Sequence, residues 1–330
     1  MSGMEPLISI LIPMHNCEKT IRRCLESLII QQPSVYEIII LDDGSSDAGG
    51  EIVQEFEKEY DFIYAYHQQN SGVAAARQKL VELAQGKYIM FCDADDFFEP
   101  DTIEFIYNLL SNKCSRTVEV ESADAIIYGY NLVREHTKRV IYGRQLKEGL
   151  HFKNEFSKYH VNGFDDLYWS SLWNKCYKTE LCRLPQTIKF EKLMEDVMFN
   201  IDYLSKCRSV YVARKPLYNY VQIGESLTRT KKVDDRNSIV EASQTYMTLY
   251  KKANSAYPGK NKHILANTYI KIKKLKTRAS GINDSELQEK LHEKYCELKK
   301  SLGAKTYLLN CKYILKELKS KLRAAMRNYL

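Results

Sequence analysis

The sequence lacks the patterns that mark secreted, zinc-binding and membrane-spanning proteins. Its nine cysteines include no Cys-x-x-Cys pair, which argues against a zinc site or a disulfide framework and favours reduced core thiols. No apolar run approaches the ~20 residues that a membrane-spanning helix needs. The chain enters its first predicted strand almost at once, so we expect no signal peptide. We therefore expect a cytoplasmic protein.

Signatures of several other classes of protein are missing too. No Gly-x-Gly-x-x-Gly occurs after the first predicted strand, which argues against a dehydrogenase. The loop there reads Pro-Met-His-Asn-Cys, where a nucleotidyltransferase would usually carry Gly with Arg and Lys. A haloacid-type phosphatase would have Thr or Val in place of Phe97. The basic residues lack a motif for reading bases, so we expect no nucleic-acid partner.

Short apolar runs alternate with amphipathic segments over the first hundred residues. The runs are expected strands, and the segments between them show the three- and four-residue spacing of helices. Such alternation predicts a parallel, doubly wound sheet, in which ligands bind at the carboxyl ends of the strands. The expected strands are 7–12, 37–41, 62–66 and 88–92, and the expected helices are 18–31, 52–56 and 73–85.

A polar motif follows each expected strand, at 13–18, 42–47, 70–72 and 93–96. These motifs should converge on one crevice, because the ends of parallel strands meet at one edge of a sheet. The last motif holds three carboxylates in four residues, which repel one another unless a positive charge lies against them. A divalent cation suits such oxygen ligands. The alternative interpretation is a helix cap or a solvated turn.

Taken together, the motifs Ile-Ser-Ile-Leu-Ile-Pro-Met-His-Asn, Asp-Asp-Gly-Ser-Ser-Asp, Asn-Ser-Gly and Asp-Ala-Asp-Asp resemble glycosyltransferase family 2. Leu-Trp-Asn-Lys at 172–175 and Glu-Asp-Val-Met-Phe at 195–199 resemble later landmarks of that family. The resemblance covers about residues 7–230. It implies an α/β protein of GT-A fold, with a mostly parallel, doubly wound sheet flanked by helices.

The resemblance also implies how the chain is divided. We expect a glycosyltransferase domain at 1–232, with a nucleotide-sugar-binding half at 1–110 and an acceptor-side half at 111–232. A helical, basic subdomain at 233–330 would follow.

For the donor, the resemblance implies UDP-sugar binding with Mn²⁺ or Mg²⁺. Asp43 would recognise the uracil ring, and a carboxylate is a reasonable acceptor for an imide N–H. Asp95 would bind the metal that bridges the diphosphate, with Asp93 beside the ribose or the metal. Arg77 would offset diphosphate charge, or form only a surface salt bridge. The remaining nucleotide-sugar residues would be Pro13, Glu18, Asn70 and Gly72.

For the reaction, the resemblance places the general base on Asp196, at the start of an expected helix. Transfer would occur by a single displacement that inverts the anomeric centre. The alternative is that Glu195 and Asp196 merely favour the helix dipole. We expect Glu195, Trp169 and Trp173 to contribute to the acceptor site. The two tryptophans are four residues apart on a possible helix, so their rings could form one platform there. The simpler interpretation is that both tryptophans are core residues.

The acceptor would be a hydroxyl of a glycan, a glycoprotein or a lipid-linked sugar. A processive, membrane-embedded synthase of the same family is disfavoured, because spanning helices and a Gln-x-x-Arg-Trp sequence are both missing. The alternative from another class is a catalytically inactive sugar-nucleotide-binding or assembly partner protein.

Positive charge is concentrated at the C-terminal end. Residues 305–330 hold seven Lys and Arg against one Glu, so six of the seven net positive charges lie there. Apolar residues in this segment share one helical face, which predicts a basic amphipathic helix. Such a helix would lie at an anionic membrane surface, making the protein peripheral at the inner face, or would pack within the protein. The C-terminal region is also a candidate surface for homo-oligomerisation.

Overall fold

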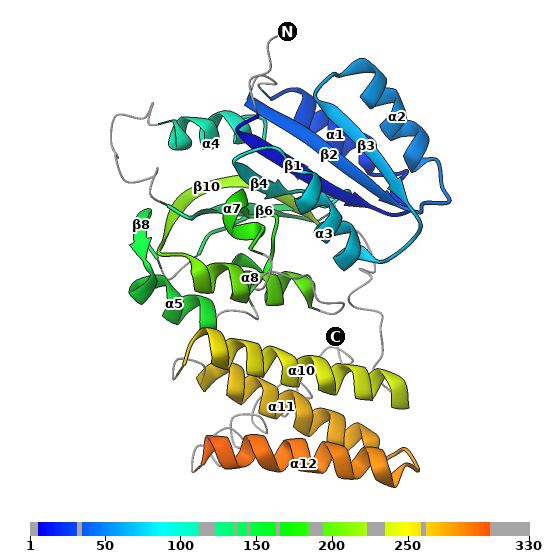
Figure 1. Ribbon diagram of the computed structural model, residues 1–330, viewed down its shortest axis with the longest axis vertical. Helices are drawn as coiled ribbons and strands as arrows, with labels where there is room; N and C mark the ends of the chain where they lie inside the picture. Colours follow the sequence, from blue (N-terminus) through cyan, green and yellow to red (C-terminus); the bar gives the residue numbers. More distant parts are fainter. Residues whose placement is uncertain are drawn as a thin grey trace, which may run out of the picture. The chain divides into compact units, whose positions relative to one another are not determined.

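The computed structural model describes residues 6–31, 35–111, 123–134, 137–143, 146–162, 166–184, 194–222, 235–258 and 262–303 (Figure 1). The chain divides into two compact units, Met1–Ser226 and Leu227–Leu330. The expected domain boundary at 232/233 lies outside the described residues, as does the basic segment 305–330.

The first unit begins with the predicted alternation of strands and helices. Parallel pairing gives the strand order β3-β2-β1-β4, and Figure 1 shows α1 and α2 on one side of these strands and α3 on the other. Every residue of β1 is buried, as expected for a strand covered on both faces. The elements are β1 (Ile8–Met14), α1 (Ile21–Ile29), β2 (Tyr36–Asp43), α2 (Gly49–Glu59), β3 (Ile63–Gln68), α3 (Val73–Leu83) and β4 (Tyr88–Phe91).

Beyond β4 the sheet becomes mixed. Strand β9 (Lys175–Lys178) runs antiparallel to β4 and to β6 (Ala125–Arg134), whereas β10 (Ser209–Val221) runs parallel to β6. The expectation of a mostly parallel sheet therefore holds for strands β1 to β4, and the rest of the sheet is mixed. The other strands, β5 (Phe97–Phe98), β7 (Thr137–Ile141) and β8 (Gly149–Phe152), form antiparallel pairs.

Five helices accompany the mixed half among the described residues. Helix α8 (Glu195–Lys206) contributes buried aromatic and aliphatic side chains to the main core, including Phe199 and Tyr203. It therefore presents its first residues at a fixed place in the unit. The other helices are α4 (Thr102–Leu110), α5 (Lys153–Asn162), α6 (Leu167–Ser170) and α7 (Thr179–Cys182).

The second unit is helical, as predicted. Helices α10 (Arg236–Ala256), α11 (Lys262–Ala279) and α12 (Ser285–Leu302) enclose a separate apolar core that includes Tyr269 and Leu291. Asp235 and Asp284 cap α10 and α12 by accepting hydrogen bonds from backbone N–H groups of the first turns. Among the described residues, we find no helix both long and apolar enough to span a membrane.

Candidate active site

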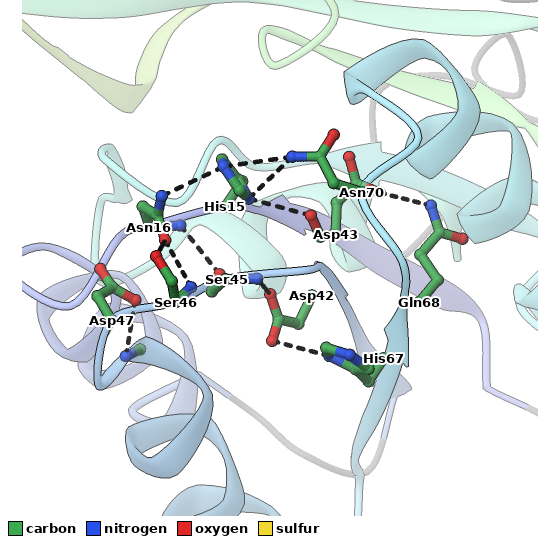
Figure 2. A network of polar contacts seen from close by, with 11 residues as sticks. His15, Asn16, Asp42, Asp43, Ser45, Ser46, Asp47, His67, Gln68 and Asn70 are labelled. Atoms are coloured by element: carbon green, nitrogen blue, oxygen red, sulfur yellow. Dashed lines mark hydrogen bonds and ion pairs between the residues drawn. The ribbon is translucent and has the colours of Figure 1, made fainter.

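The carboxyl ends of β1, β2 and β3 meet around the buried side chain of Asp43 (Figure 2). Its Oδ1 accepts hydrogen bonds from Gln68 Nε2 and from the backbone N–H of Ser71, both at 2.8 Å, and its Oδ2 accepts one from the N–H of Gly72 at 2.8 Å. The expected uracil acceptor thus also anchors the loop that leads into α3. A base bound here would meet a carboxylate whose position is already set.

Two glycines allow this approach. Gly72, whose N–H donates to Asp43, has φ +87°, a backbone conformation that residues with an L side chain rarely adopt. Gly44 has φ +73°, and a Cβ there would lie 2.8 Å from the backbone nitrogen of Asn70. The Asp-Asp-Gly-Ser and Asn-Ser-Gly motifs therefore depend on each other: the glycine of one makes room for the backbone of the other.

His15, to which sequence analysis gave no role, lies at the centre of the polar network in Figure 2. Its Nδ1 is 3.0 Å from the backbone oxygen of Asp43, and its Nε2 is 3.2 Å from Asn16 Nδ2 and 3.3 Å from Asn70 Nδ2. A carbonyl oxygen only accepts, so Nδ1 carries the proton and Nε2 accepts from the two amides. Asn70, an expected site residue, thus contacts the ring of His15. The sequence signals for His15 are its position just after β1 and its place in the first polar motif, at 13–18.

Glu18 and Pro13 hold the same region together. Glu18 donates its backbone N–H to Asp47 Oδ2 at 2.9 Å, and its carboxylate lies 3.3 Å from the N–H of Ala48. Pro13 is buried inside β1, in register with Leu41 of β2. In the structure both residues shape the backbone around the loop that follows β2.

The acidic motif forms a cluster at the end of β4. One carboxylate oxygen from each of Asp93, Asp95 and Asp96 lies within 4.8 Å of the others. Asp95 is exposed, whereas Asp96 is fully buried and accepts hydrogen bonds from the Tyr218 hydroxyl at 2.8 Å and from the N–H of Val221 at 2.7 Å. Burial raises the pKa of Asp96 well above its usual range, and the charge of Asp93 adds to the shift. Asp96 therefore ties the motif to β10, while Asp95 faces outward.

Arg77 connects this cluster to the start of α8. The guanidinium is buried; it donates from Nη2 to Asp93 at 2.9 Å and from Nη1 to Glu195 at 2.7 Å, and Nη1 lies 3.4 Å from Asp196. The three carboxylates hold the pKa of Arg77 above its ordinary value despite its burial. Because Arg77 is buried, the alternative of a helix-surface salt bridge is excluded. The planar fork suits a group that must reach several carboxylates at once.

The first two residues of α8 have different surroundings. Glu195 has 17 % of its side chain exposed, and Asp196 has 34 %. Burial raises the pKa of Glu195 to about 7, the charge of Asp196 adds to this, and Arg77 opposes it. The preceding residue, Met194, has φ 54°, in the left-handed region. The pair thus offers one carboxyl that holds a proton near neutrality and one more exposed carboxylate beside it.

The two tryptophans do not form the expected helical platform. Helix α6 ends at Ser170, so Trp173 lies outside it, and both rings are buried. Trp173 stacks on Tyr218 at 4.7 Å between ring centroids and on Tyr220 at 5.2 Å. Four-residue spacing brings side chains together only where the helix continues. The core interpretation of these residues is the one that the structure supports.

Lys175 is the last residue of the Leu-Trp-Asn-Lys motif, and the sequence suggested no role for it. It is fully buried. Its Nζ donates to the backbone oxygens of Tyr168 at 3.1 Å and Ser171 at 2.5 Å, and to Asn174 Oδ1 at 2.8 Å. Asn200 of α8 donates to the Ser170 oxygen at 2.7 Å and to the Asp196 oxygen at 3.0 Å. Lys175 and Asn200 therefore join the 168–174 segment to the helix that carries Asp196.

The chain resembles known proteins over part of its length. Residues 9–167, which contain the Asp43 network, Arg77 and the acidic cluster, match the family described as Glycosyl transferase family 2. This match covers 159 of the 330 residues. The chain is 27 % identical to the glycosyltransferase GlyA of Streptococcus pneumoniae over 289 residues, and 34 % identical to EpsH of Bacillus subtilis over 226 residues. These matches span 86 % and 65 % of the chain, but only 40 % of GlyA and 60 % of EpsH.

The fold has solved counterparts. A structure of S. aureus TarS 1–349 in complex with UDP-GlcNAc superposes with a TM-score of 0.57 at 18 % identity, covering 88 % of this chain and 91 % of that one. The expected GT-A fold is thereby confirmed.

Proposed function

We propose that this protein is a family 2 glycosyltransferase, metal-dependent and inverting, that moves one sugar from a UDP-sugar to an acceptor hydroxyl. The observation that carries the proposal is the continuous set of charges from Asp95 and Asp93 through Arg77 to Glu195 and Asp196. It brings candidate metal ligands and a candidate base into one site, next to the Asp43 network.

The residues present fit a divalent cation. Asp95 is exposed at the end of β4, and Asp93 has 28 % of its side chain exposed, so both oxygen donors are accessible to an ion. Asp96 is a poorer ligand, because it is buried and accepts hydrogen bonds from β10. Mn²⁺ or Mg²⁺, when bound, would offset the negative charge that develops on a departing diphosphate. Asp93 and Asp95 would hold it.

Asp196 is the better candidate base of the α8 pair. A base must be ionised and accessible, and Asp196 is more exposed than Glu195, whose pKa is raised to about 7. In the proposed step Asp196 takes the proton of the acceptor hydroxyl while the hydroxyl oxygen attacks the anomeric carbon. The bond from that carbon to the diphosphate oxygen breaks, and UDP leaves. One displacement turns an α-linked donor into a β-linked product.

The donor assignment is supported by the resemblance and by solved neighbours. TarS was crystallised with UDP and with UDP-GlcNAc, whereas a mannosyltransferase from Pyrobaculum calidifontis was crystallised with GDP-Man and Mn²⁺. We therefore propose calorimetric titration of the chain with UDP, GDP and dTDP, each with and without Mn²⁺. We expect Mn²⁺-dependent binding of UDP that is lost in Asp95→Ala and kept in Asp101→Ala, a control at an exposed aspartate. Metal-independent binding, or binding of GDP alone, would contradict the proposed donor and cofactor.

A sugar-transfer assay tests whether Asp196 is the base. Asp196→Asn should bind UDP as the wild type does but lose about 10²–10⁴-fold in turnover of UDP-sugars presented with glycan, glycoprotein or lipid-linked acceptors. Asp202→Asn, on the same helix, should keep the wild-type rate. Normal transfer by Asp196→Asn would rule out its role as base. Nucleotide binding without turnover of any donor by the wild type would favour the inactive assembly partner instead.

A further inference from the structure

The helical second unit contains a pocket between α10 and α12. Its volume is about 140 Å³. The apolar part of its lining comes from Val240 on α10 and from Leu287 and Leu291 on α12. Leu287 and Leu291 also belong to the core of the unit, so they are held in place by packing. The pocket is thus part of the folded bundle and has an apolar wall with a fixed shape.

The polar part of the lining consists of Ser243, Gln244 and three cationic side chains, Arg236, Lys290 and Lys294. Arg236 forms ion pairs with Asp284 and, at 3.6 Å, with Glu286. Lys290 also pairs with Glu286. The two carboxylates therefore form ion pairs with two of the three cations.

The third cation is Lys294. Its Nζ donates to Ser243 Oγ at 2.9 Å, and in the part of the chain that the structure describes no carboxylate pairs with it. Burial lowers the pKa of Lys294, the charges of Lys251 and Lys290 add to the shift, and the charge of Glu297 opposes it. A half-buried ammonium beside two other cations gains more from an arriving anion than an exposed one does, because water screens it less.

We propose that this pocket binds a phosphate group carried on a small organic ligand. A phosphate dianion can accept hydrogen bonds on separate oxygens from Lys294 and Arg236, and its charge offsets the surplus positive charge of the pocket. The Ser243 hydroxyl already donates to the backbone oxygen of Val240 at 2.8 Å. The apolar wall of Val240, Leu287 and Leu291 would contact the organic part. This site lies wholly in the second unit and does not depend on the proposed transferase reaction.

Phenyl phosphate, inorganic phosphate and benzoate are suitable probes, titrated by calorimetry into the full chain without UDP or Mn²⁺, because UDP itself carries phosphate groups. We expect saturable binding of phenyl phosphate, at least fivefold weaker binding of inorganic phosphate and of benzoate, and loss of affinity as salt is raised. Lys294→Gln should weaken phenyl phosphate binding about tenfold. Lys299→Gln, an exposed change later on α12, should stay within twofold of the wild type.

A second measurement needs no substitution. Acetylation of lysines by a limiting reagent, followed by mass spectrometry, should show Lys294 protected by phenyl phosphate while Lys299 is not. The proposal would be overturned if Lys294→Gln bound phenyl phosphate as tightly as the wild type does. It would also be overturned if phenyl phosphate left the acetylation of Lys294 unchanged. Equal affinity for benzoate would overturn its phosphate class.

Discussion

Replacing Arg77 by Met should destabilise the first unit strongly. The substitution removes a buried guanidinium that donates to Asp93 at 2.9 Å and to Glu195 at 2.7 Å, and that lies 3.4 Å from Asp196. Three carboxylates would then face one another without a cation. Removing one partner of a buried charge pair costs about 3–5 kcal/mol, because the remaining charge is left buried and uncompensated. We expect a loss in that range at pH 8.

The assay can be confined to the first unit. Both tryptophans of the chain, Trp169 and Trp173, are buried there, so urea unfolding followed by tryptophan fluorescence reports on that unit alone. The matched control is Lys79→Met on the same helix, whose pair with Glu82 is 3.7 Å long and about half exposed. Such a surface pair contributes about 0–1 kcal/mol, so the control should remain close to the wild type.

Acid should partly rescue the variant. Without Arg77 the carboxylates bind protons more tightly in the folded state than in the unfolded state, so the loss should shrink as the pH falls from 8 to 5. Arg77→Lys should lie between the wild type and Arg77→Met, because an ammonium keeps the charge but cannot span the three carboxylates. A loss below about 1 kcal/mol at pH 8, or a loss that is equal at pH 5, would refute the view of Arg77 as the link between the two motifs.

Three further predictions use the same unfolding assay. Burial raises the pKa of Glu195 from 4.5 to about 7, so this carboxyl holds its proton more tightly in the folded protein than in the unfolded chain, and the free energy of unfolding of the wild type should fall as the pH rises from 4.5 to 7. Glu195→Gln should remove up to about 3 kcal/mol of this fall, and an equal fall in the variant would contradict the raised pKa. Gly72→Ala should lower the free energy of unfolding by about 1–3 kcal/mol, because the φ of Gly72 is +87°. The control Gly50→Ala, inside α2, should leave stability unchanged or raise it. Equal effects of the two substitutions would argue against strain at position 72. Tyr218→Phe should lower the free energy of unfolding by about 1–3 kcal/mol, because it leaves buried polar groups of the acidic motif unpaired. Tyr220→Phe, in the same strand, should lower it less. A larger loss in Tyr220→Phe than in Tyr218→Phe would contradict the contacts of the Tyr218 hydroxyl.

The parallel half of the sheet and its edge were predictable from local patterns. Apolar runs of four to six residues mark strands, and three- and four-residue spacing marks the helices between them. The polar motifs after these strands had to meet, because parallel strands end at one edge of the sheet. The contacts of Asp43 with the loop at 70–72 are the direct outcome, and they join residues 28 and 29 positions apart.

The mixed half was less accessible to sequence reasoning. The direction of β9 depends on its partners β4 and β6, and nothing in the residues Lys175–Lys178 distinguishes a parallel from an antiparallel strand. The same holds for Trp169 and Trp173, since their spacing suits a helix but the helix ends between them. Local patterns do not say where a helix ends when the tertiary core competes for its side chains.

The order of the motifs and the make-up of the acidic cluster can be read along the chain, because Asp93, Asp95 and Asp96 are neighbours in it. The groups that face this cluster come from distant segments, and folding brings them there. Arg77 and Glu195 are 118 residues apart, and their contact exists because α3 and α8 are packed in the same unit. Charge pairs of this kind follow from the packing of distant elements, and no periodicity in the chain encodes them.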